Sequence, residues 1–505
     1  LLESADITTK ASRTTVAVLE ASARLTCWGG TVTAEALSTV DGEGPGADGL
    51  AALARLEERL SEHLADRSPS RLTLALPTSA DDDATDATIE ERERLTALST
   101  IEPLRVLAQA EVDHPHLPLE AGAFAFDYLS TFESLPEVAQ GANTCPDYLF
   151  YDARIILVVD HPTQEATLVG ASVDAAELER RLDALAAAIN TAADAAEHSP
   201  APPEVAADSA VLHAVPTTSD ADFEAVVETM RGYIADGDVY QVVPSRGFTI
   251  DCPDALAAYH VLRHANPSPY MFYLAAPDFE LFGASPESAL LYSVRSGRVA
   301  IRPIAGTRPR GLHLDGSVDH ERDTRLELEL RTDAKEVAEH VMLVDLARND
   351  VARVSRPGTR SVQDLLRVDR YSRVMHLVSE VSGELAEDLD ALDAFRASMT
   401  MGTLTGAPKL RAAELIRQAE GVRRGSYGGS VGYIRGDGEL DTCIVIRSGF
   451  VVDGTALVQA GAGVVAASSP AAEAAETVHK ARAVLEAVAA AQGAALVIDT
   501  TGKEA

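Results

Sequence analysis

Apolar and polar residues follow two kinds of pattern in the first part of the chain. Short apolar runs such as 71–76 (RLTLAL) and 153–159 (ARIILVV) predict strands, and stretches such as 49–64 predict helices. A longer helix rich in alanine is predicted over 176–192. Between these elements, 79–88 (SADDDATDAT) has no apolar periodicity and predicts a solvated loop. The pattern indicates mixed strands and helices up to residue 192.

A break in the pattern follows. Residues 193–218 contain HSPAPPEVAADS and lack periodicity, which predicts a linker or a surface loop. A new helix is expected at Ser219, a suitable N-cap, because Phe223, Val227 and Met230 recur at helical spacing. Beyond it, strands and helices alternate densely. We therefore divide the chain into an N-terminal module (1–192), a linker or loop (193–218), a second module (219–490) and a C-terminal tail (491–505).

Charge changes this picture by excluding two classes of partner. The 505 residues carry 43 Lys and Arg against 78 Asp and Glu, a net charge of −35. So acidic a chain is a poor binder of nucleic acid or of an anionic membrane surface, since both need clustered cations. Residues 1–218 carry −24 and residues 219–505 carry −11, so most cations follow the linker. The 46% hydrophobic content is ordinary for a globular protein.

The sequence gives no sign of export or of a membrane. It has no run of about 18 apolar residues. The first residues, LLES, have neither a basic nor an apolar leader region. The cysteines are scattered, without CxxC spacing, at Cys27, Cys145, Cys252 and Cys443. Because such usage fits a reducing compartment, we expect a cytoplasmic protein.

Two Glu-x-x-Glu pairs are candidates for binding a cation. Glu336 and Glu339 lie three residues apart in a predicted helix, and Glu473 and Glu476 open another helix after Ser-Pro. Residues at this spacing project from one side of one helical turn. Four carboxylates suit a hard cation, with magnesium as the default. Each pair alone is more typical of a solvated helix face than of a metal ligand, and both interpretations stay open.

Glycine-rich segments with cations and hydroxyls are candidates for binding anions. They are 302–311 (RPIAGTRPRG), 402–409 (GTLTGAPK), 425–429 (GSYGG) and 459–463 (QAGAG). Backbone N–H groups exposed by glycine, joined by Arg and Tyr, make carboxylate receptors. Arg447 follows a predicted strand over 442–447 and adds a guanidinium. Glycine pairs also mark ordinary turns, so the patterns alone are weak.

Two further residues are candidates for proton transfer. Glu287 lies in a polar break, GASPES, after a strand-like run, and His376 lies in the apolar run VMHLV. A histidine so placed is either catalytic or a satisfied core residue. From the residues alone, we expect an enzyme that acts on a small carboxylated substrate with a magnesium ion.

Seven motifs together resemble a known family. In order, they are PIAGTRPRG, KEVAEHVMLVDLARND, VDRYSRVMHLVSEV, MGTLTGAPKLRA, GSYGGSVGY, DTCIVIRS and QAGAGVV. The series is similar to the chorismate-utilising enzymes, most closely the large synthase subunits of anthranilate synthases. It is dense over 219–490 and thinner before that, through LLESAD at 1–6 and CPDY at 145–148. The resemblance implies an α+β fold, a layered sandwich of mainly antiparallel sheets with helices outside and interlocked N- and C-terminal parts.

The resemblance also implies a reaction and its residues. Ammonia adds to carbon 2 of chorismate as the hydroxyl on carbon 4 leaves, and pyruvate is then eliminated to give anthranilate, the first committed step of tryptophan biosynthesis. Mg²⁺ bridges the ring carboxylate to the protein. The implied residues are Glu287 (general acid), His376 (pyruvate elimination), Gln241 and Thr403 in the catalytic set; Gly306, Thr307, Tyr427, Arg447, Gly461, Gly463 and Lys480 for substrate; and Glu336, Glu339, Glu473 and Glu476 for the metal.

Two positions discriminate among the chorismate enzymes. Isochorismate and salicylate synthases carry a water-activating lysine where this chain has Gln241. Aminodeoxychorismate synthases typically carry a nucleophilic lysine where this chain has Ala305. Two alternatives stay open: an enzyme that stops at aminodeoxyisochorismate, which the presence of His376 disfavours, and a catalytically silent tryptophan-binding homologue, which the intact glutamates disfavour.

Regulation and assembly are implied as well. In the family, tryptophan inhibits by feedback, and Glu3 could hold its ammonium. The implied inhibitor residues are Glu3, Ser4, Ala5, Pro269, Tyr270, Met271, Gly283, Val431 and Tyr433. None of the four cysteines lies in a Gly-x-Cys-x-Gly elbow, so we expect a separate glutamine amidotransferase subunit to supply ammonia. The expected assembly is a heterotetramer of two synthase and two glutaminase subunits.

Overall fold

The computed structural model describes residues 1–5, 12–38, 44–78, 91–110, 112, 114–196, 210–313, 317–371 and 374–500. The loop predicted at 79–88 therefore lies outside the described residues. The helices are α1 (Ala47–Leu60), η1 (Ser61–His63), α2 (Glu91–Thr96), α3 (Glu102–Ala108), η2 (Phe126–Thr131), α4 (Ala175–Ala196), α5 (Asp220–Ala235), α6 (Ala255–Ala265), α7 (His320–Thr332), α8 (Ala334–Val354), α9 (Ala391–Ser398), α10 (Gly402–Thr405), α11 (Lys409–Glu420) and α12 (Pro470–Ala491). No described helix has the length and apolar character needed to cross a membrane.

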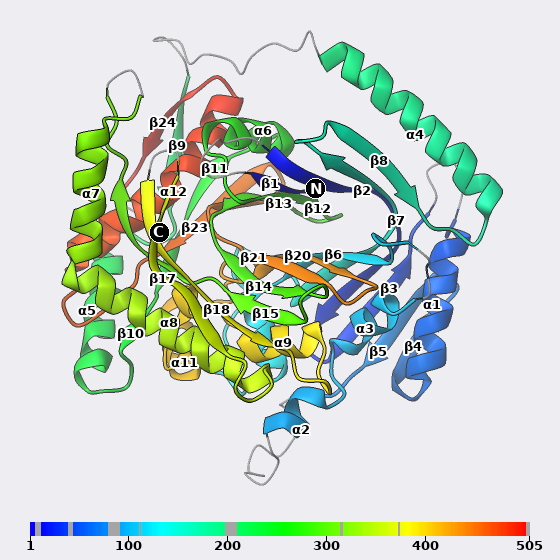
Figure 1. Ribbon diagram of the computed structural model, residues 1–505, viewed down its shortest axis with the longest axis horizontal. Helices are drawn as coiled ribbons and strands as arrows, with labels where there is room; N and C mark the ends of the chain where they lie inside the picture. Colours follow the sequence, from blue (N-terminus) through cyan, green and yellow to red (C-terminus); the bar gives the residue numbers. More distant parts are fainter. Residues whose placement is uncertain are drawn as a thin grey trace.

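The strands outnumber the helices and form the centre of the molecule (Figure 1). They are β1 (Leu2–Ala5), β2 (Ser12–Trp28), β3 (Thr31–Ala36), β4 (Leu64–Ser68), β5 (Arg71–Ala75), β6 (Leu119–Phe124), β7 (Tyr148–Asp160), β8 (Glu165–Gly170), β9 (Val211–Pro216), β10 (Gln241–Val242), β11 (Ser245–Asp251), β12 (Tyr270–Ala275), β13 (Glu280–Ser285), β14 (Ser288–Ser293), β15 (Arg298–Ile301), β16 (Ile304–Pro309), β17 (Ser361–Arg370), β18 (Val374–Glu384), β19 (Gly406–Ala407), β20 (Ser430–Arg435), β21 (Leu440–Ile444), β22 (Ser448–Val452), β23 (Thr455–Gly461) and β24 (Ala495–Ile498).

Two long strands, β2 and β7, connect two antiparallel sheets. They pair with each other from Thr14↔Asp160 to Cys27↔Tyr148. One end of this pair continues through β1, β12, β13, β22, β23, β11 and β9 to β24. The other end continues through β6, β20, β21, β14 and β15 to β18, which also pairs with β16 and β17. The predicted class, an α+β sandwich of mainly antiparallel sheets, is confirmed.

A core of aromatic and aliphatic side chains lies between the two sheets. Phe272, Leu281 and Phe450 of the first sheet pack with Val431 and Cys443 of the second. Fully burying one such side chain stabilises the fold by about 1.5–3 kcal/mol. Helices cover the outer faces, α6 and α12 on the first sheet and α8 and α9 beside the second (Figure 1). Helices α8 and α12 carry the two Glu-x-x-Glu pairs in their first turns.

Several predicted elements form with shifted limits. The helix expected at Ser219 is α5, and the Ser219 Oγ accepts the Asp222 N–H at 3.1 Å as a cap. The strand expected over 442–447 is β21, which ends at Ile444: the Ile446 N–H donates back to the Ile444 carbonyl at 3.0 Å, and Arg447 then takes a positive φ of 51°. Backbone in that region does not continue a strand.

Two strands lie inside segments that the sequence indicated to be a linker and a tail. Residues 211–216, expected within the linker 193–218, form β9, and residues 495–498, expected within the tail 491–505, form β24. The two strands are parallel and in register from Ala495↔Val211 to Ile498↔Ala214. Since β9 also pairs with β11, backbone hydrogen bonding to a preformed sheet orders these short segments.

Candidate active site

Glu287 lies in the short break between β13 and β14. Its backbone N–H donates to the Ser285 Oγ at 3.3 Å, and its carbonyl accepts the Ile444 N–H at 3.0 Å. The residue is 6% exposed, and burial raises the pKa of its carboxyl to about 8, although the Thr403 hydroxyl, the Ile304 backbone and the charge of Lys480 oppose this shift. At neutral pH the carboxyl is therefore mostly protonated and can give up a proton.

His376 is paired with Thr307 across β16 and β18. The Thr307 Oγ1 and the His376 Nδ1 share a hydrogen bond of 2.9 Å. Burial, with a smaller effect from Arg447, lowers the pKa of the imidazole to about 4, and a hydrogen bond with the Gly306 backbone opposes this. Gly306 has a φ of 82°, where β16 bulges between Ala305 and Thr307. The imidazole is thus neutral and held in one orientation at pH 7.

Arg447, Tyr427 and Lys480 meet at the end of β23. A Cβ at Gly461 would lie 3.0 Å from the Tyr427 hydroxyl and 2.9 Å from the Pro244 carbonyl, so only glycine fits there. The Lys480 Nζ donates to the Gly461 carbonyl at 2.9 Å. Burial lowers the pKa of the Arg447 guanidinium, which Tyr427 and Glu476 partly offset. The Arg447 guanidinium and the Tyr427 phenol interact electrostatically, and such a pair suits a carboxylate.

Gln241 lies against the backbone of Gly463. A Cβ at Gly463 would lie 3.3 Å from the Gln241 Nε2, and Gln241 is buried. Its short strand, β10, pairs with β19 at Ala407 and so joins the site to the GTLTGAPK motif. The Gln241 side chain is an amide and cannot take a proton from water at neutral pH.

The charges of all four predicted metal-binding glutamates act on Lys335. Glu336 and Glu339 lie in the first turns of α8, and Glu473 and Glu476 lie in the first turns of α12. Burial disfavours the Lys335 ammonium, but the charges of Glu339, Glu473, Glu336 and Glu476 together raise its pKa. The N-terminal turns of the two helices are therefore close enough for all four carboxylates to influence the same ammonium.

The fit of these carboxylates to Mg²⁺ can be judged from their contacts. Cations hold three of them: Arg308 Nη1 lies 2.9 Å from Glu336, Lys335 Nζ lies 3.6 Å from Glu339, and Lys480 Nζ lies 2.7 Å from Glu476. Among the residues the structure describes, no three His, Cys, Asp or Glu side chains converge closely enough to hold a metal. The Glu339 Oε1 is nevertheless buried without a hydrogen-bond partner in that part of the chain. The donor chemistry fits Mg²⁺, which prefers carboxylate oxygens.

The predicted inhibitor residues lie on β1, β12, β13 and β20. Strands β1 and β12 pair at Glu3↔Met271, and Ala5 ends β1. The Glu3 carboxylate accepts the Arg263 Nε–H at 2.7 Å and the Tyr259 hydroxyl at 3.0 Å, so a guanidinium already occupies the oxygens expected to hold an ammonium. The Ser4 Oγ accepts the Thr14 N–H, and Gly283 pairs with Phe272 of β12. Tyr270 packs against the core cluster that contains Val431. Pro269 directly precedes β12, and Tyr433 lies on β20.

Comparisons with known proteins decide the family. A family model described as chorismate binding enzyme matches residues 67–486. The chain belongs to the chorismate binding enzymes. Anthranilate synthase component 1 of Vibrio cholerae is 48% identical over 97% of this chain and 91% of its own length, and that of Escherichia coli is 48% identical over 98% and 92%. The crystal structure of anthranilate synthase component I from Streptococcus pneumoniae matches with a TM-score of 0.70 and 26% identity over 94% of this chain and 92% of that one. The resemblance inferred from the sequence is confirmed.

Sequence reasoning missed some residues of this chorismate binding enzyme's site. Lys335 was not assigned a role, although the chain has only five lysines and this one directly precedes Glu336. Tyr371 was also missed, and its ring meets the His376 ring edge-on at 5.1 Å between centroids. Its signal in the sequence is only its place in the motif VDRYSRVMHLV.

Proposed function

We propose that this chain is the synthase component of an anthranilate synthase, which converts chorismate and ammonia into anthranilate and pyruvate. The observation that carries the proposal is the buried Glu287 carboxyl, whose pKa of about 8 keeps it protonated beside Thr403 and Lys480. Family membership and the 48% identity to proteins named anthranilate synthase component 1 support it.

Glu287 is the general acid of the proposed reaction. The hydroxyl on carbon 4 of chorismate is a poor leaving group unless it is protonated as its bond breaks. A carboxylic acid kept neutral by burial provides that proton at neutral pH. The charge of Lys480 favours the carboxylate that remains.

Arg447 and Lys480 bind the substrate's carboxylates. Chorismate is a dianion, and the guanidinium of Arg447 suits a bidentate contact with one carboxylate. The Tyr427 hydroxyl lies beside Gly461 and donates a further hydrogen bond to the substrate, and the Gly461 carbonyl positions the Lys480 ammonium by accepting from it. Because the surrounding site is buried, each contact is stronger than it would be in water.

His376 acts in the second half of the reaction. Elimination of pyruvate requires loss of the ring proton, and a neutral imidazole oriented by Thr307 is a competent acceptor. We assign Glu336, Glu339, Glu473 and Glu476 to hold Mg²⁺. When bound, Mg²⁺ neutralises the ring carboxylate and so eases attack on the ring.

Ammonia rather than water is the proposed nucleophile. Gln241 is buried against Gly463 and offers no base to activate water. Ala305, in β16, offers no side-chain nucleophile for a covalent route. Both observations favour direct amination at carbon 2.

A partner and an inhibitor belong to the same proposal. The four cysteines are buried, and burial raises the pKa of each thiol, which is unlike a glutaminase nucleophile. We therefore assign glutamine hydrolysis to a separate subunit, in a heterotetramer of two subunits of each kind. Tryptophan is the proposed feedback inhibitor, bound where β1 meets β12.

One assay tests the activity. Purified chain with chorismate, Mg²⁺ and an ammonium salt should produce the fluorescence of anthranilate, and tryptophan should suppress it. Chorismate consumed without fluorescence would instead favour an enzyme that stops at aminodeoxyisochorismate. No consumption of chorismate would contradict the proposal, and turnover indifferent to tryptophan would remove the inhibitor part alone.

A further inference from the structure

The ring of Tyr371 lies against the imidazole of His376. The two rings meet edge-on, with 5.1 Å between their centroids and 74° between their planes, a geometry that aromatic pairs favour. Tyr371 is buried, with 8% of its surface exposed. It is thus in direct contact with a residue of the proposed mechanism, although no step of that mechanism uses it.

The backbone of Tyr371 is held by hydrogen bonds on both sides. The residue follows β17, and its N–H donates to the carbonyl of Val374, the first residue of β18, at 2.8 Å. Its own carbonyl accepts the Arg310 Nη1–H at 2.6 Å. The Tyr371 ring therefore meets His376 from a fixed backbone.

Arg310 is in turn anchored to α7 by Asp323. The Arg310 Nε and Nη2 donate to the two carboxylate oxygens of Asp323 at 2.8 and 3.0 Å, a bidentate ion pair. The same carboxylate accepts the Gly311 N–H at 2.8 Å and lies 3.6 Å from the Nε of Arg370, the residue before Tyr371. A Cβ at Gly311 would lie 2.2 Å from the Asp323 nitrogen, so only glycine allows this approach. The residues that follow β16 thus form a tether from α7 to the Tyr371 carbonyl.

A base such as His376 needs a fixed ring plane as well as a free lone pair. Its Nδ1 shares a hydrogen bond of 2.9 Å with the Thr307 Oγ1. One hydrogen bond at one ring atom leaves the imidazole free to tilt about that bond. The edge-on contact with Tyr371 restrains the tilt. Because proton transfer requires close alignment of donor and acceptor, both contacts matter for the rate.

The phenol of Tyr371 is poorly suited to transfer a proton itself. Burial raises its pKa, and the charges of Asp369 and Glu287 raise it further, against a smaller opposing effect of Arg367 and Arg302. The phenol therefore stays neutral at physiological pH and is a weaker acid than free tyrosine. The ring rather than the hydroxyl is left to account for the contact with His376.

We propose that Tyr371 is a positioning residue whose ring, tethered through Arg310 and Asp323, holds the His376 imidazole in the orientation that pyruvate elimination requires, an assignment that rests on the proposed function. In that step His376 takes the proton from carbon 2 of aminodeoxyisochorismate, the C–H electrons form the double bond to carbon 3, and the bond from carbon 3 to oxygen breaks. Enolpyruvate leaves and gains a proton at its methylene carbon to become pyruvate. A loosened imidazole slows this step but not the amination that precedes it.

The products of Tyr371→Leu test the proposal. Anthranilate formation should fall by about 10–100-fold while chorismate consumption stays within about threefold, so that aminodeoxyisochorismate becomes the main product in liquid chromatography. Tyr371→Phe keeps the ring and should restore the wild-type product ratio. A loss in Tyr371→Phe equal to that in Tyr371→Leu would assign the effect to the hydroxyl and overturn the proposal.

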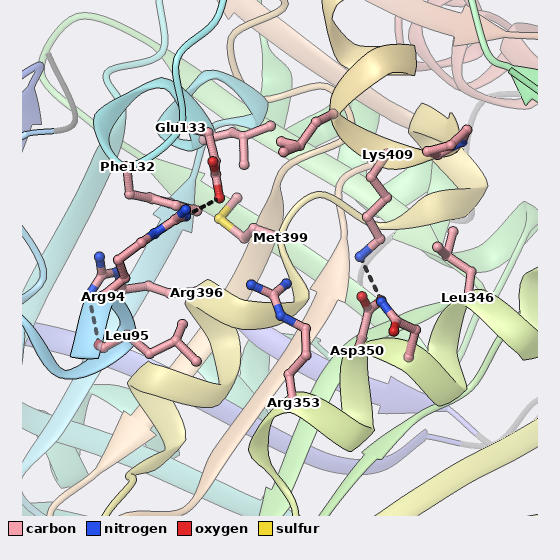
Figure 2. A pocket seen from close by; sticks show the side chains of 14 residues that line it. Arg94, Leu95, Phe132, Glu133, Leu346, Asp350, Arg353, Arg396, Met399 and Lys409 are labelled. Carbon is pink, nitrogen blue, oxygen red and sulfur yellow. Dashed lines mark hydrogen bonds and ion pairs between the residues drawn. The ribbon is translucent and has the colours of Figure 1, made fainter. Parts of the chain in front are cut away.

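Phe132→Leu is the matched control, because it removes a similar ring contact elsewhere. The Phe132 ring meets the Tyr128 ring edge-on with 5.6 Å between centroids, and it lines a pocket of about 440 Å³ (Figure 2). The described lining of this pocket includes no residue assigned above to substrate, metal or proton transfer. Phe132→Leu should therefore leave the product ratio unchanged. A shift as large as that of Tyr371→Leu would show that the loss of any such ring has this effect, which would overturn the proposal.

A double-mutant cycle asks whether Tyr371 acts through His376. In His376→Gln the base is already lost, so the addition of Tyr371→Leu should lower anthranilate formation by less than about threefold more. A further loss as large as that in the wild-type background would show an independent role and contradict the positioning role.

The orientation of His376 separates this proposal from the proposed function. A crystal structure of Tyr371→Leu should show the imidazole in more than one orientation, whether or not the chain makes anthranilate. A single orientation with the Thr307 hydrogen bond intact would overturn the positioning role even in an active anthranilate synthase. The wild-type assay with chorismate tests the proposed function by itself.

Arg310→Lys serves as the test if Tyr371→Leu fails to fold. Lysine keeps the positive charge but lacks the planar fork that binds Asp323 and the Tyr371 carbonyl together. Release of aminodeoxyisochorismate should therefore rise in Arg310→Lys as well. An unchanged product ratio would contradict the tether.

Discussion

Burial moves the proton equilibria of Glu287 and His376 in opposite directions. It raises the pKa of the carboxyl to about 8 and lowers that of the imidazole to about 4. Between these values the acid keeps its proton and the base is free of one, which is the state that the proposed reaction requires. Burial is thus the main cause of both pKa shifts, and it fixes the protonation state of each group at neutral pH.

The pH dependence of turnover follows from Glu287. A general acid acts only while protonated, so kcat, measured at a constant concentration of free ammonia, should fall as pH rises through about 8. Glu287→Gln should lower kcat by about 10²–10⁴-fold and remove this alkaline decline from the remaining activity. An alkaline decline that persists unchanged in Glu287→Gln would assign it to another group.

A second buried acid affects stability rather than turnover. Glu120 and Asp152 face each other across β6 and β7, and Glu120 is fully buried. Burial, followed by the charge of Asp152, raises the pKa of Glu120 well above its ordinary 4.5. A raised carboxyl pKa means that the folded state holds the proton more tightly, so stability is lost as pH rises above 4.5 toward the folded value.

Glu120→Gln should therefore stabilise the protein by about 1–3 kcal/mol at pH 8 and by much less at pH 4. Urea unfolding at the two pH values measures this difference. Glu165→Gln, at an exposed position of β8, is the control and should change stability by less than about 0.5 kcal/mol at either pH. Equal effects of Glu120→Gln at both pH values would show that the raised pKa does not govern stability.

At the scale of elements, two helix N-termini form the proposed metal site. Helices α8 and α12 both begin with acidic first turns, where the helix dipole favours negative charge. The dipoles partly offset the repulsion among four carboxylates, and Lys335, Arg308 and Lys480 offset more of it. A bound divalent cation would offset the repulsion among the four carboxylates in place of these side chains.

Glu339→Gln tests this assignment. It removes a buried carboxylate oxygen that has no hydrogen-bond partner among the described residues, so Mg²⁺-dependent turnover should fall by about 10–100-fold while the thermal midpoint stays close to that of the wild type. Asp345→Asn, an exposed position on the same helix, should leave the Mg²⁺ dependence unchanged. Unaltered turnover in Glu339→Gln would exclude Glu339 from the metal site.

Local sequence patterns predicted individual helices and strands but not the tertiary contacts between them. The cap at Ser219 and the Glu-x-x-Glu pairs are visible within a few residues of sequence. Strands β9 and β24 escaped prediction because they are short and ordered by pairing with residues far along the chain. Likewise, the glutamates near Lys335 come from two helices that begin at residues 334 and 470. A local sequence pattern carries no information about which distant helices lie together.

At the scale of the whole molecule, the two sequence modules share their cores. Arg417 binds Asp127 at 2.7 Å, and Arg423 binds Asp147 at 2.5 Å, both across the boundary near residue 218. A core cluster likewise joins Leu25, Phe124 and Phe150 to Leu290 and Phe395. The net charge of −35 gives no general attraction for a dianion such as the proposed substrate, so the proposed function depends on local cations, for which we propose Arg447 and Lys480.

Residues 1–192 alone should therefore not fold stably. Separated from the second module, this fragment would expose the β6 edge and half of the shared core. Circular dichroism of the isolated fragment should show no cooperative thermal transition, whereas the full chain should give one. A cooperative transition in the fragment would establish it as an independent domain.

The pairing of β6 with β20 imposes a delay during protein synthesis. Glu120 pairs with Ile434, a residue translated more than 300 positions later. At about 5–20 residues per second, the ribosome needs about 15–60 s to deliver that partner strand. Throughout this interval β6 presents an open edge, the kind of surface on which nascent chains aggregate. The layered architecture thus leaves an unpaired strand edge on the emerging chain, and the finished protein covers this edge with β20.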